Sequence, residues 1–274
     1  MSTDGLPDFE VPPVVETVLA VRYRDIPGLD APRLVKFWDD HLSADLPTIE
    51  ERPPYEAPVE QFGQDSGTSS VALRIGTPIP SPRFFCSSGT DLIQLQQDWF
   101  AYNWRKTPEN PDYTRYEQGR AKFERWLTNL NSYVHELLGT RLMPTQCEVT
   151  YINHVALTAE DLTSGPFGSV LRNIQPRSGA FLPSPETSRH ASVYVIPGDE
   201  GSPIGRLHVA ADRAWAGEAR EPIVLLSLTA RGAPRASEIS SVLEFLDLGR
   251  RWVVRGFVDM TTSSFHRRWG LSAD

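Results

Sequence analysis

Hydrophobic residues along this chain recur either at every second position or at helical spacing, and the two patterns follow one another in a regular order. Residues 14–24 alternate with period two, which predicts a strand with one buried face. Residues 30–46 carry apolar side chains at helical spacing behind Asp30, a suitable N-cap, and predict a helix that ends before Pro47. The stretch 50–70 is dense in Pro, Gly and Glu, so we expect a long surface loop there.

Short strands and a long helix are predicted next. Residues 71–75 and 83–86 are short apolar runs, and residues 91–105 divide into two strands around a central turn. Residues 113–138 then trace one apolar stripe of a long helix, and Gly139 follows as its C-cap.

The second part of the chain repeats this order. The elements predicted there are a strand at 146–155, a short helix over 164–174, three strands at 190–196, 205–213 and 222–230, a long helix at 237–258 and a terminal turn of helix around 265–269. The motif Pro-x-x-x-Glu occurs in the first strand of each part, at residues 12–16 and 144–148.

These patterns predict an α+β fold built from a duplicated strand-helix-three strands-helix unit. A mostly antiparallel sheet would pack on two long helices, in loose similarity to duplicated saddle or helix-grip folds. Residues 11–140 and 141–260 would form two halves packed as one globular unit, and residues 261–274 a C-terminal helical tail. Any pocket would then be expected where the two halves meet.

Composition and charge narrow the class of protein. The 274 residues are 40% hydrophobic, enough for a sizeable core, and the formal charge of -8 disfavours nucleic acid as a partner. No run approaches the roughly 20 apolar residues that cross a bilayer, so membrane spanning is not expected. Cys86 and Cys147 lie in apolar stretches and are predicted to be buried free thiols of a cytoplasmic protein. Residues 1–13, rich in Pro and acid, would form a tail or a strap.

Three motifs taken together resemble a sporadically distributed family of uncharacterised bacterial proteins. They are Pro-Pro-Val-Val-Glu at 12–16, Leu-Ile-Gln-Leu-Gln followed by Asn-Trp-Arg within 92–105, and Gln-Cys-Glu-Val-Thr-Tyr-Ile-Asn-His at 146–154. Thr-Thr, His and Trp-Gly within 261–270 extend the match over nearly the whole chain. The resemblance implies a bacterial protein, and the patchy distribution of the family hints at mobile elements or defence. It implies no activity, cofactor or catalytic residue.

The hairpin at 91–105 offers a first candidate site. Its turn sets Leu95 opposite Phe100 and Gln94 opposite Ala101, so that one face of the hairpin belongs to the core. The other face carries polar residues beside an aromatic ring: Gln94, Gln96, Trp99, Asn103 and Arg105. Amides and a guanidinium around a stacking surface suit a planar or anionic polar ligand. The alternative is a solvated sheet face with one partly covered Trp.

The strand at 146–154 offers a second candidate site. Glu148 and His154 are an acid/base pair by residue type. At about 3.3 Å per residue they stand roughly 20 Å apart, so each would act only with residues of another strand. We predict that Tyr151, Asn153 and His154 line a pocket. The alternative is a structural carboxylate and a hydrogen-bonded, half-buried histidine.

The remaining sequence patterns give little indication of a functional site. A basic cluster near the C-terminus is the one candidate nucleic-acid footprint, but a helix face with an Asp247–Arg251 salt bridge explains much of it; its members are Arg250, Arg251, Arg255, Arg267 and Arg268. The chain has no G-x-S-x-G, no P-loop, no H-E-x-x-H and no paired C-x-x-C. We therefore expect no cofactor and no metal.

The leading functional hypothesis is a cytoplasmic, non-catalytic binding or interaction module. Its partner would be a protein or a small polar ligand, and a homodimer is left open. The alternative is a hydrolase-like enzyme with a site between the two halves around Glu148 and His154. A deep pocket whose titratable groups have shifted pKa values would favour the enzyme, and a shallow face would favour the module.

Overall fold

The computed structural model describes residues 5–62, 82–165, 167–172, 174, 181, 185 and 188–272. Its strands are β1 (Val14–Tyr23), β2 (Thr48–Arg52), β3 (Arg83–Ser87), β4 (Asp91–Gln96), β5 (Trp99–Arg105), β6 (Pro144–Ala156), β7 (Arg189–Pro197), β8 (Pro203–Ala216) and β9 (Glu221–Gly232). Its α-helices are α1 (Ala31–His41), α2 (Tyr116–Leu138), α3 (Ala159–Leu162), α4 (Ile239–Met260) and α5 (Ser263–Arg268).

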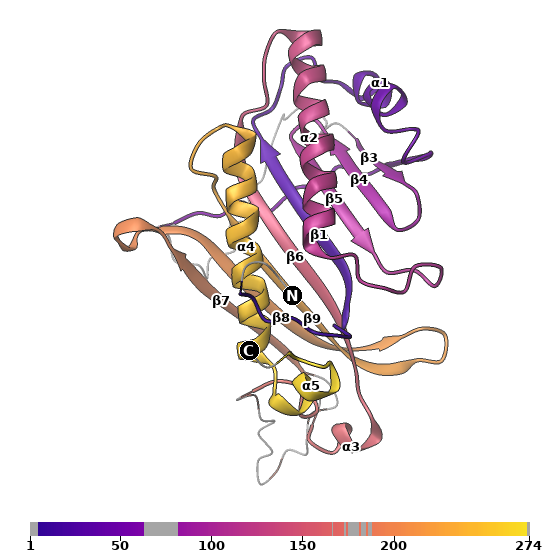
Figure 1. Ribbon diagram of the computed structural model, residues 1–274, viewed down its shortest axis with the longest axis vertical. Helices are drawn as coiled ribbons and strands as arrows, with labels where there is room; N and C mark the ends of the chain where they lie inside the picture. The colour runs from indigo at the N-terminus through magenta and orange to yellow at the C-terminus, as the bar shows by residue number, and fades with distance from the viewer. Residues whose placement is uncertain are drawn as a thin grey trace.

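The described strands form one antiparallel sheet in the order β2-β3-β4-β5-β1-β6-β9-β8-β7. The two long helices, α2 and α4, lie side by side over one face of this sheet (Figure 1). Their apolar stripes bury that face, since Phe123, Leu130, Val242 and Leu246 are each fully buried. The predicted α+β class, with an antiparallel sheet packed on two long helices, is confirmed.

The same order of elements runs outward from the middle of the sheet in both directions. β1 and β6 pair antiparallel at the centre, and β5, β4 and β3 follow on one side where β9, β8 and β7 follow on the other. The long helix follows β5 in the first half and β9 in the second. The halves are thus joined both by the central ladder and by the contact of α2 with α4. Descent of the two halves from a duplication stays a prediction.

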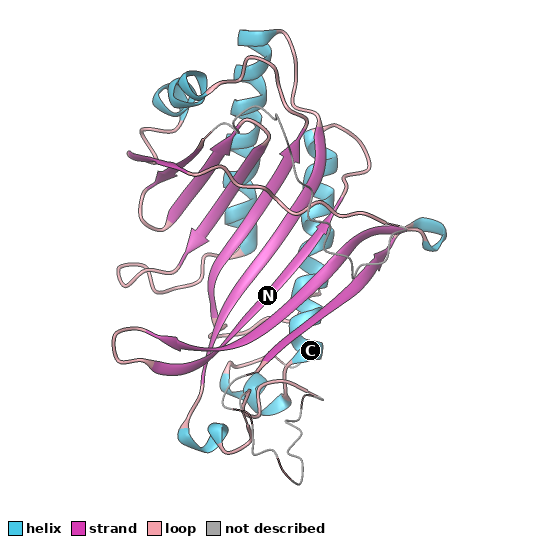
Figure 2. Ribbon diagram, turned by 180° about the vertical axis from the view of Figure 1, so that it is seen from behind, coloured by secondary structure: helices cyan, strands magenta, loops and turns pink. Residues whose placement is uncertain are grey.

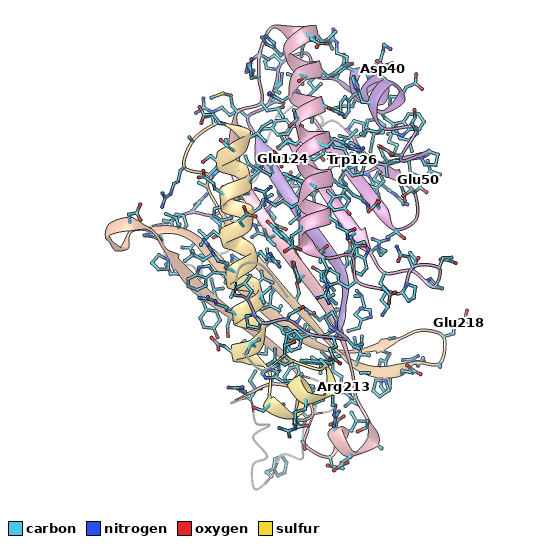
Figure 3. All side chains as sticks on the ribbon, in the orientation of Figure 1. Asp40, Glu50, Glu124, Trp126, Arg213 and Glu218 are labelled. Carbon is cyan, nitrogen blue, oxygen red and sulfur yellow. The ribbon has the colours of Figure 1, made fainter. Side chains whose placement is uncertain are left out.

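The β4–β5 hairpin has the predicted register, with Leu95 opposite Phe100 and Gln94 opposite Ala101. Its core face packs on aromatic residues of α2. The ring centres of Phe100 and Phe123 are 5.5 Å apart, and those of Tyr102 and Trp126 are 5.7 Å apart. Trp126 lies on α2 (Figure 3). Gly139 ends α2 with a positive φ of 67°, as predicted.

Two segments fold differently from their sequence predictions. Residues 48–52, partly assigned to a surface loop, form the edge strand β2 and pair with β3. The short helix predicted over 164–174 is instead α3, several residues earlier, where Thr158 and Asp161 form a capping box. Gly165 and Gly168, both with positive φ, turn the chain after it. The strand predicted at 71–75 lies outside the described residues.

Among the described residues, the sheet face opposite α2 and α4 carries no helix and is crossed by residues 53–62, which we call the crossing segment (Figure 2). Two glutamine side chains fix it by bonding its backbone on both sides. The Tyr55 N–H donates to Gln96 Oε1 at 2.8 Å, and Gln96 Nε2 donates to Tyr55 O at 3.0 Å. Gln146 bonds Glu60 N and Pro58 O in the same way, at 2.9 and 2.8 Å. The crossing segment therefore reaches from the first half to the second.

Cys86 and Cys147 are buried free thiols, as predicted. Burial raises the pKa of Cys86 to about 12, so this thiol stays protonated near neutral pH. None of the helices described here combines the length and the apolar character needed to cross a bilayer.

Candidate binding site

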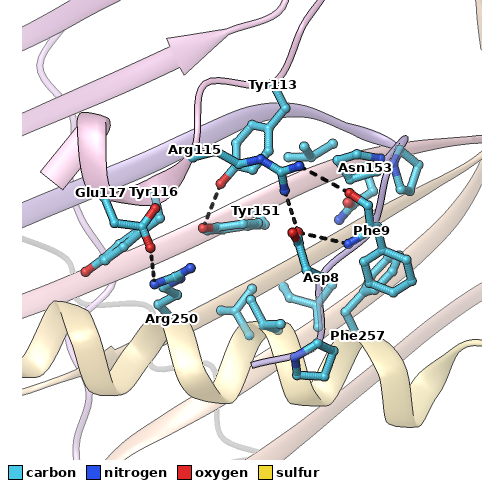
Figure 4. A pocket seen from close by; sticks show the side chains of 17 residues that line it. Asp8, Phe9, Tyr113, Arg115, Tyr116, Glu117, Tyr151, Asn153, Arg250 and Phe257 are labelled. Atoms are coloured by element: carbon cyan, nitrogen blue, oxygen red, sulfur yellow. Dashed lines mark hydrogen bonds and ion pairs between the residues drawn. The ribbon is translucent and has the colours of Figure 1, made fainter. Parts of the chain in front are cut away.

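A cavity of about 400 Å³ lies where the two halves meet (Figure 4). It is bounded by β6 and β9, the start of α2, the middle of α4 and the N-terminal segment before β1. Much of the lining is apolar, with Val14, Leu228, Val253, Val254 and Phe257. A second group is polar: Asp8, Tyr113, Arg115, Tyr116, Glu117, Tyr151, Asn153 and Arg250. The volume lies within the roughly 300–1,000 Å³ typical of small-molecule pockets.

The period-two geometry of β6 decides which predicted residues reach this cavity. Tyr151 and Asn153 point to the helix-covered face and line it. Glu148 and His154 occupy the other parity and belong to the opposite face. Tyr151 and Asn153 thus line this cavity, whereas His154 is not among its lining residues. Ligand binding by Glu148, Tyr151, Asn153 and His154 stays a prediction.

The N-terminal segment closes one side of the cavity because it is bonded to the other end of the chain. The N–H groups of Glu10 and Val11 donate to Gly270 O and Trp269 O at 3.2 and 3.0 Å. The Phe9 ring then packs edge-on against the Phe257 ring at 5.6 Å. Part of the Pro-rich stretch predicted to be a tail or a strap is therefore a wall of the cavity.

Two tyrosine hydroxyls meet at the polar end. The Tyr113 hydroxyl donates to the Tyr151 oxygen at 3.0 Å. Burial raises the pKa of both tyrosines, so both stay protonated near neutral pH. The bond from Tyr113 and the positive charge of Arg250 lower the pKa of Tyr151 and oppose the effect of burial. Since the Tyr151 oxygen accepts the bond from Tyr113, its own hydrogen is available as a donor.

Two guanidinium groups flank these hydroxyls. Arg250 is 11% exposed, forms an ion pair with Glu117 at 2.9 Å and lies 4.5 Å from the centre of the Tyr116 ring. Arg115 forms an ion pair with Asp8 and also donates to Phe9 O at 3.4 Å. Each guanidinium thus has a carboxylate partner within the cavity lining.

Asn153 supplies a partly engaged amide. It is 4% exposed, and its Nδ2 donates to Leu226 O at 3.0 Å. Within the described part of the chain, its Oδ1 and the second N–H of its amide have no protein partner. A buried amide with open hydrogen-bonding capacity normally faces water or a ligand.

Glu148 belongs to an ion-pair network on the helix-free face. Arg231 Nε donates to Glu148 Oε2 at 2.7 Å, and Arg231 also pairs with Glu60 of the crossing segment at 3.3 Å. Arg206 and His208 bind the same Glu60 carboxylate, at 2.6 and 2.5 Å. Burial alone would raise the pKa of Glu60, but the bonds from His208 and Arg206 and the neighbouring positive charges lower it to about 2.

His154 takes no part in that network. It is exposed on the helix-free face, and partial burial of its ring lowers its pKa. The structure does not bring Glu148 and His154 together, in agreement with the separation expected along one strand.

The polar residues of the β4–β5 hairpin bond mainly to one another. Gln94 Nε2 donates to Asn103 Oδ1 at 2.8 Å, and Asn103 Nδ2 donates to Glu16 Oε1 at 2.7 Å. Arg105 lies 3.5 Å from the same Glu16 oxygen. Each of these residues therefore has a protein partner, in contrast to the open amide of Asn153.

Trp99 is covered by the crossing segment rather than by solvent. Its side chain is 3% exposed, and the Tyr55 ring packs edge-on against it at 5.3 Å. The space above Trp99 in which a ligand was expected is thus occupied by the chain itself. Ligand binding by Gln94, Gln96, Trp99, Asn103 and Arg105 stays a prediction.

Two members of the predicted basic cluster are engaged within the protein. Arg250 points into the cavity lining, and Arg268 binds Asp161 with both nitrogens, at 2.7 and 2.9 Å. Asp247, expected to pair with Arg251, instead accepts from Arg120 at 2.8 and 3.0 Å. The contact of α2 with α4 brings Arg120 to this carboxylate, which no spacing within one helix reveals.

No group of three or more His, Cys, Asp or Glu within the described ranges is placed to hold a metal ion. Compared with known proteins, the chain matches no protein-family model and no curated protein. We therefore infer the function from the geometry of the cavity.

Sequence reasoning missed Tyr113, Arg115 and Arg250 as cavity residues. Tyr113 was placed in the helical stripe, Arg115 carried no pattern, and Arg250 was assigned to a basic cluster. The sequence did predict a pocket between the two halves. That expectation could have pointed to these residues, because Tyr113 and Arg115 directly precede α2 and Arg250 lies on α4.

Proposed function

We propose that this chain is a non-catalytic binding protein that holds a small ligand in the cavity between its two halves. The observation that carries the proposal is the cavity of about 400 Å³, with an apolar lining and a few convergent polar groups. That combination is typical of sites that bury most of a small molecule and orient it by a few hydrogen bonds.

A deep pocket whose titratable groups have shifted pKa values was the feature expected of an enzyme, but the direction of the shifts in this cavity favours binding over catalysis. A general base or nucleophile works best with a pKa near the operating pH. Burial instead raises the pKa values of Tyr113, Tyr116 and Tyr151, so these hydroxyls act as neutral hydrogen-bond donors. The hydrolase-like alternative depends on Glu148 and His154, which lie apart on the opposite face, with Glu148 held by Arg231.

A neutral fluorescent probe tests the proposal. N-phenyl-1-naphthylamine brightens when it enters an apolar cavity, and we expect saturable binding to the native protein. Val254→Trp places an indole in the cavity and should weaken that binding at least tenfold. Val258→Trp is the matched control, because Val258 is also half-buried on α4 but does not line the cavity. Absence of saturable binding, or equal weakening in both variants, would refute the proposal.

Native mass spectrometry tests the same site without an added probe. We expect the purified protein to retain a small molecule whose mass is lost in Val254→Trp and kept in Val258→Trp. The same spectrum reports the number of subunits, for which a homodimer is the prediction left open above.

A further inference from the structure

We propose that the ligand of this cavity is an acidic small molecule, with an apolar body and one carboxylate or sulfonate group bound by Arg250 and Tyr151. This inference rests on the proposed binding function and specifies its ligand class. It follows from the balance of donors and acceptors, from the relative burial of the charges and from the position of the apolar residues.

Donors outnumber acceptors among the open positions of the neutral groups Tyr151 and Asn153. The Tyr151 hydroxyl has its own hydrogen available, because its oxygen accepts from Tyr113. Asn153 adds one N–H. The one open acceptor that we assign among these groups is Asn153 Oδ1. A ligand group that accepts several hydrogen bonds fits this set, and an acid group is the strongest such acceptor.

The charges are buried unequally. The Arg250 side chain is 11% exposed, whereas its partner Glu117 is 52% exposed. The positive member of the pair therefore lies deeper, where water screens less, and the negative member lies toward solvent. A ligand inside the cavity meets the guanidinium at closer range than the carboxylate, which favours an anion.

The cavity already accommodates a carboxylate of the chain itself. Asp8, in the N-terminal wall, pairs with Arg115 and lines the same space. Both guanidiniums have a carboxylate partner, but the Arg115 side chain is 46% exposed and the Arg250 side chain 11%, so the ligand acid is assigned to the more deeply buried Arg250. Figure 4 shows Arg250 and Tyr151 on one side of the cavity, and Asp8 with Arg115 on the other.

The remaining lining fixes the rest of the ligand. Val253, Val254 and Phe257 continue along α4 beyond Arg250 and offer only apolar surface. Asn153 stands two residues from Tyr151, about 7 Å along β6. An apolar body attached to the acid, with a hydrogen-bonding group near Asn153, would satisfy both.

Two probes that differ by one acid group test this inference. 8-Anilinonaphthalene-1-sulfonate is N-phenyl-1-naphthylamine with a sulfonate added, so their Kd ratio isolates recognition of the acid. We expect the sulfonate to bind at least tenfold more tightly than the neutral probe. Arg250→Gln should bring the ratio to within threefold of unity. Arg251→Gln, which removes the same charge from an exposed neighbouring position on α4, should leave the ratio as it is.

Tyr151→Phe is a second, milder variant that removes one oxygen from the site. We expect it to weaken binding of the sulfonate about threefold to tenfold, as for loss of one hydrogen bond. If the neutral probe binds and the sulfonate binds no more tightly, the acid assignment is overturned while the binding function stands. An equal loss of preference in Arg250→Gln and Arg251→Gln would also overturn it, because surface charge would then explain the ratio. If neither probe binds, the binding function itself fails.

Discussion

Glu60 is the residue on which the crossing segment depends most. Its carboxylate contacts Arg206, Arg231 and His208, and Glu148 contacts the other side of Arg231. The side chains of Glu60, Glu148 and both arginines are between 8% and 12% exposed. Two carboxylates balance two guanidiniums in this network, so loss of one carboxylate leaves a buried positive charge without compensation.

Glu60→Gln should therefore lower the free energy of unfolding by about 3 kcal/mol, the cost of breaking a buried ion pair. Urea unfolding of the variant and the native protein gives the difference. Glu50→Gln is the matched control, because the Glu50 side chain is 61% exposed on the edge strand β2 and should change stability by less than about 0.5 kcal/mol. Equal stability of the two variants would contradict this account of Glu60.

The same carboxylate predicts a pH dependence. The pKa of Glu60 falls from 4.5 to about 2 on folding, so the unfolded chain takes up this proton at higher pH than the folded protein. The stability that Glu60 contributes should be fully present above about pH 5 and decline as the pH falls toward 2. We expect the stability difference between native protein and Glu60→Gln to shrink over that interval. A difference that is constant from pH 6 to pH 3 would argue against the assignment.

At the scale of elements, the sequence predicted those features that depend only on local residue patterns. The register of the β4–β5 hairpin and the Gly139 cap followed from alternation and from one glycine. The crossing segment has no period, and its bonds to Gln96, Gln146 and Arg206 join residues far apart in sequence. Sequence patterns do not encode such contacts, so the cover over Trp99 was not predicted.

The candidate site was predicted in part for the same reason. Alternation along β6 separates Tyr151 and Asn153 from Glu148 and His154, and this parity alone would have divided the two pairs between the two faces. The contributions of Arg115 and Asp8 come from irregular segments that the ends of the chain hold in place. Only the tertiary arrangement brings these residues to the cavity.

The short helix α3 depends on one buried carboxylate. The Asp161 side chain is 2% exposed, accepts hydrogen bonds from Thr158 N and Oγ1, and binds Arg268 of α5. The bonds from Arg268 hold the pKa of Asp161 far below its usual range, despite burial. This carboxylate therefore both caps α3 and ties it to α5.

Asp161→Asn should lower the free energy of unfolding by about 2 kcal/mol, because charged hydrogen bonds are lost while Arg268 stays partly hydrated. At about 2–4 °C per kcal/mol, the Tm would fall by about 4–8 °C. Differential scanning calorimetry measures the shift, with Glu160→Gln at the exposed neighbouring position as control. A Tm within 1 °C of the control would refute this role.

At the scale of the whole molecule, the two halves share their most buried elements. The ladder of β1 with β6 is the middle of the sheet, and Tyr116 and Arg120 of α2 bind Asp247 of α4. Each half alone would expose an unpaired central strand and one side of its long helix. The cavity exists only when both are present.

Separate expression of residues 1–140 and 141–274 tests this dependence. We expect neither fragment to unfold cooperatively alone, and an equimolar mixture to regain a cooperative transition by circular dichroism and to bind N-phenyl-1-naphthylamine. A sharp thermal transition in an isolated fragment would show that its half is an independent domain.

The crossing segment also has a consequence for synthesis of the protein in the cell. The partners of Glu60 are made long after it, since Arg206 follows by 146 residues and Arg231 by 171. At about 5–20 residues per second, the nascent chain waits roughly ten to thirty seconds for them on the ribosome. During that delay the Glu60 end of the crossing segment has no ion-pair partners, and the cover over Trp99 is held within the first half by the bonds of Gln96 to Tyr55. A chaperone that binds nascent chains would meet the first half of this protein in that state.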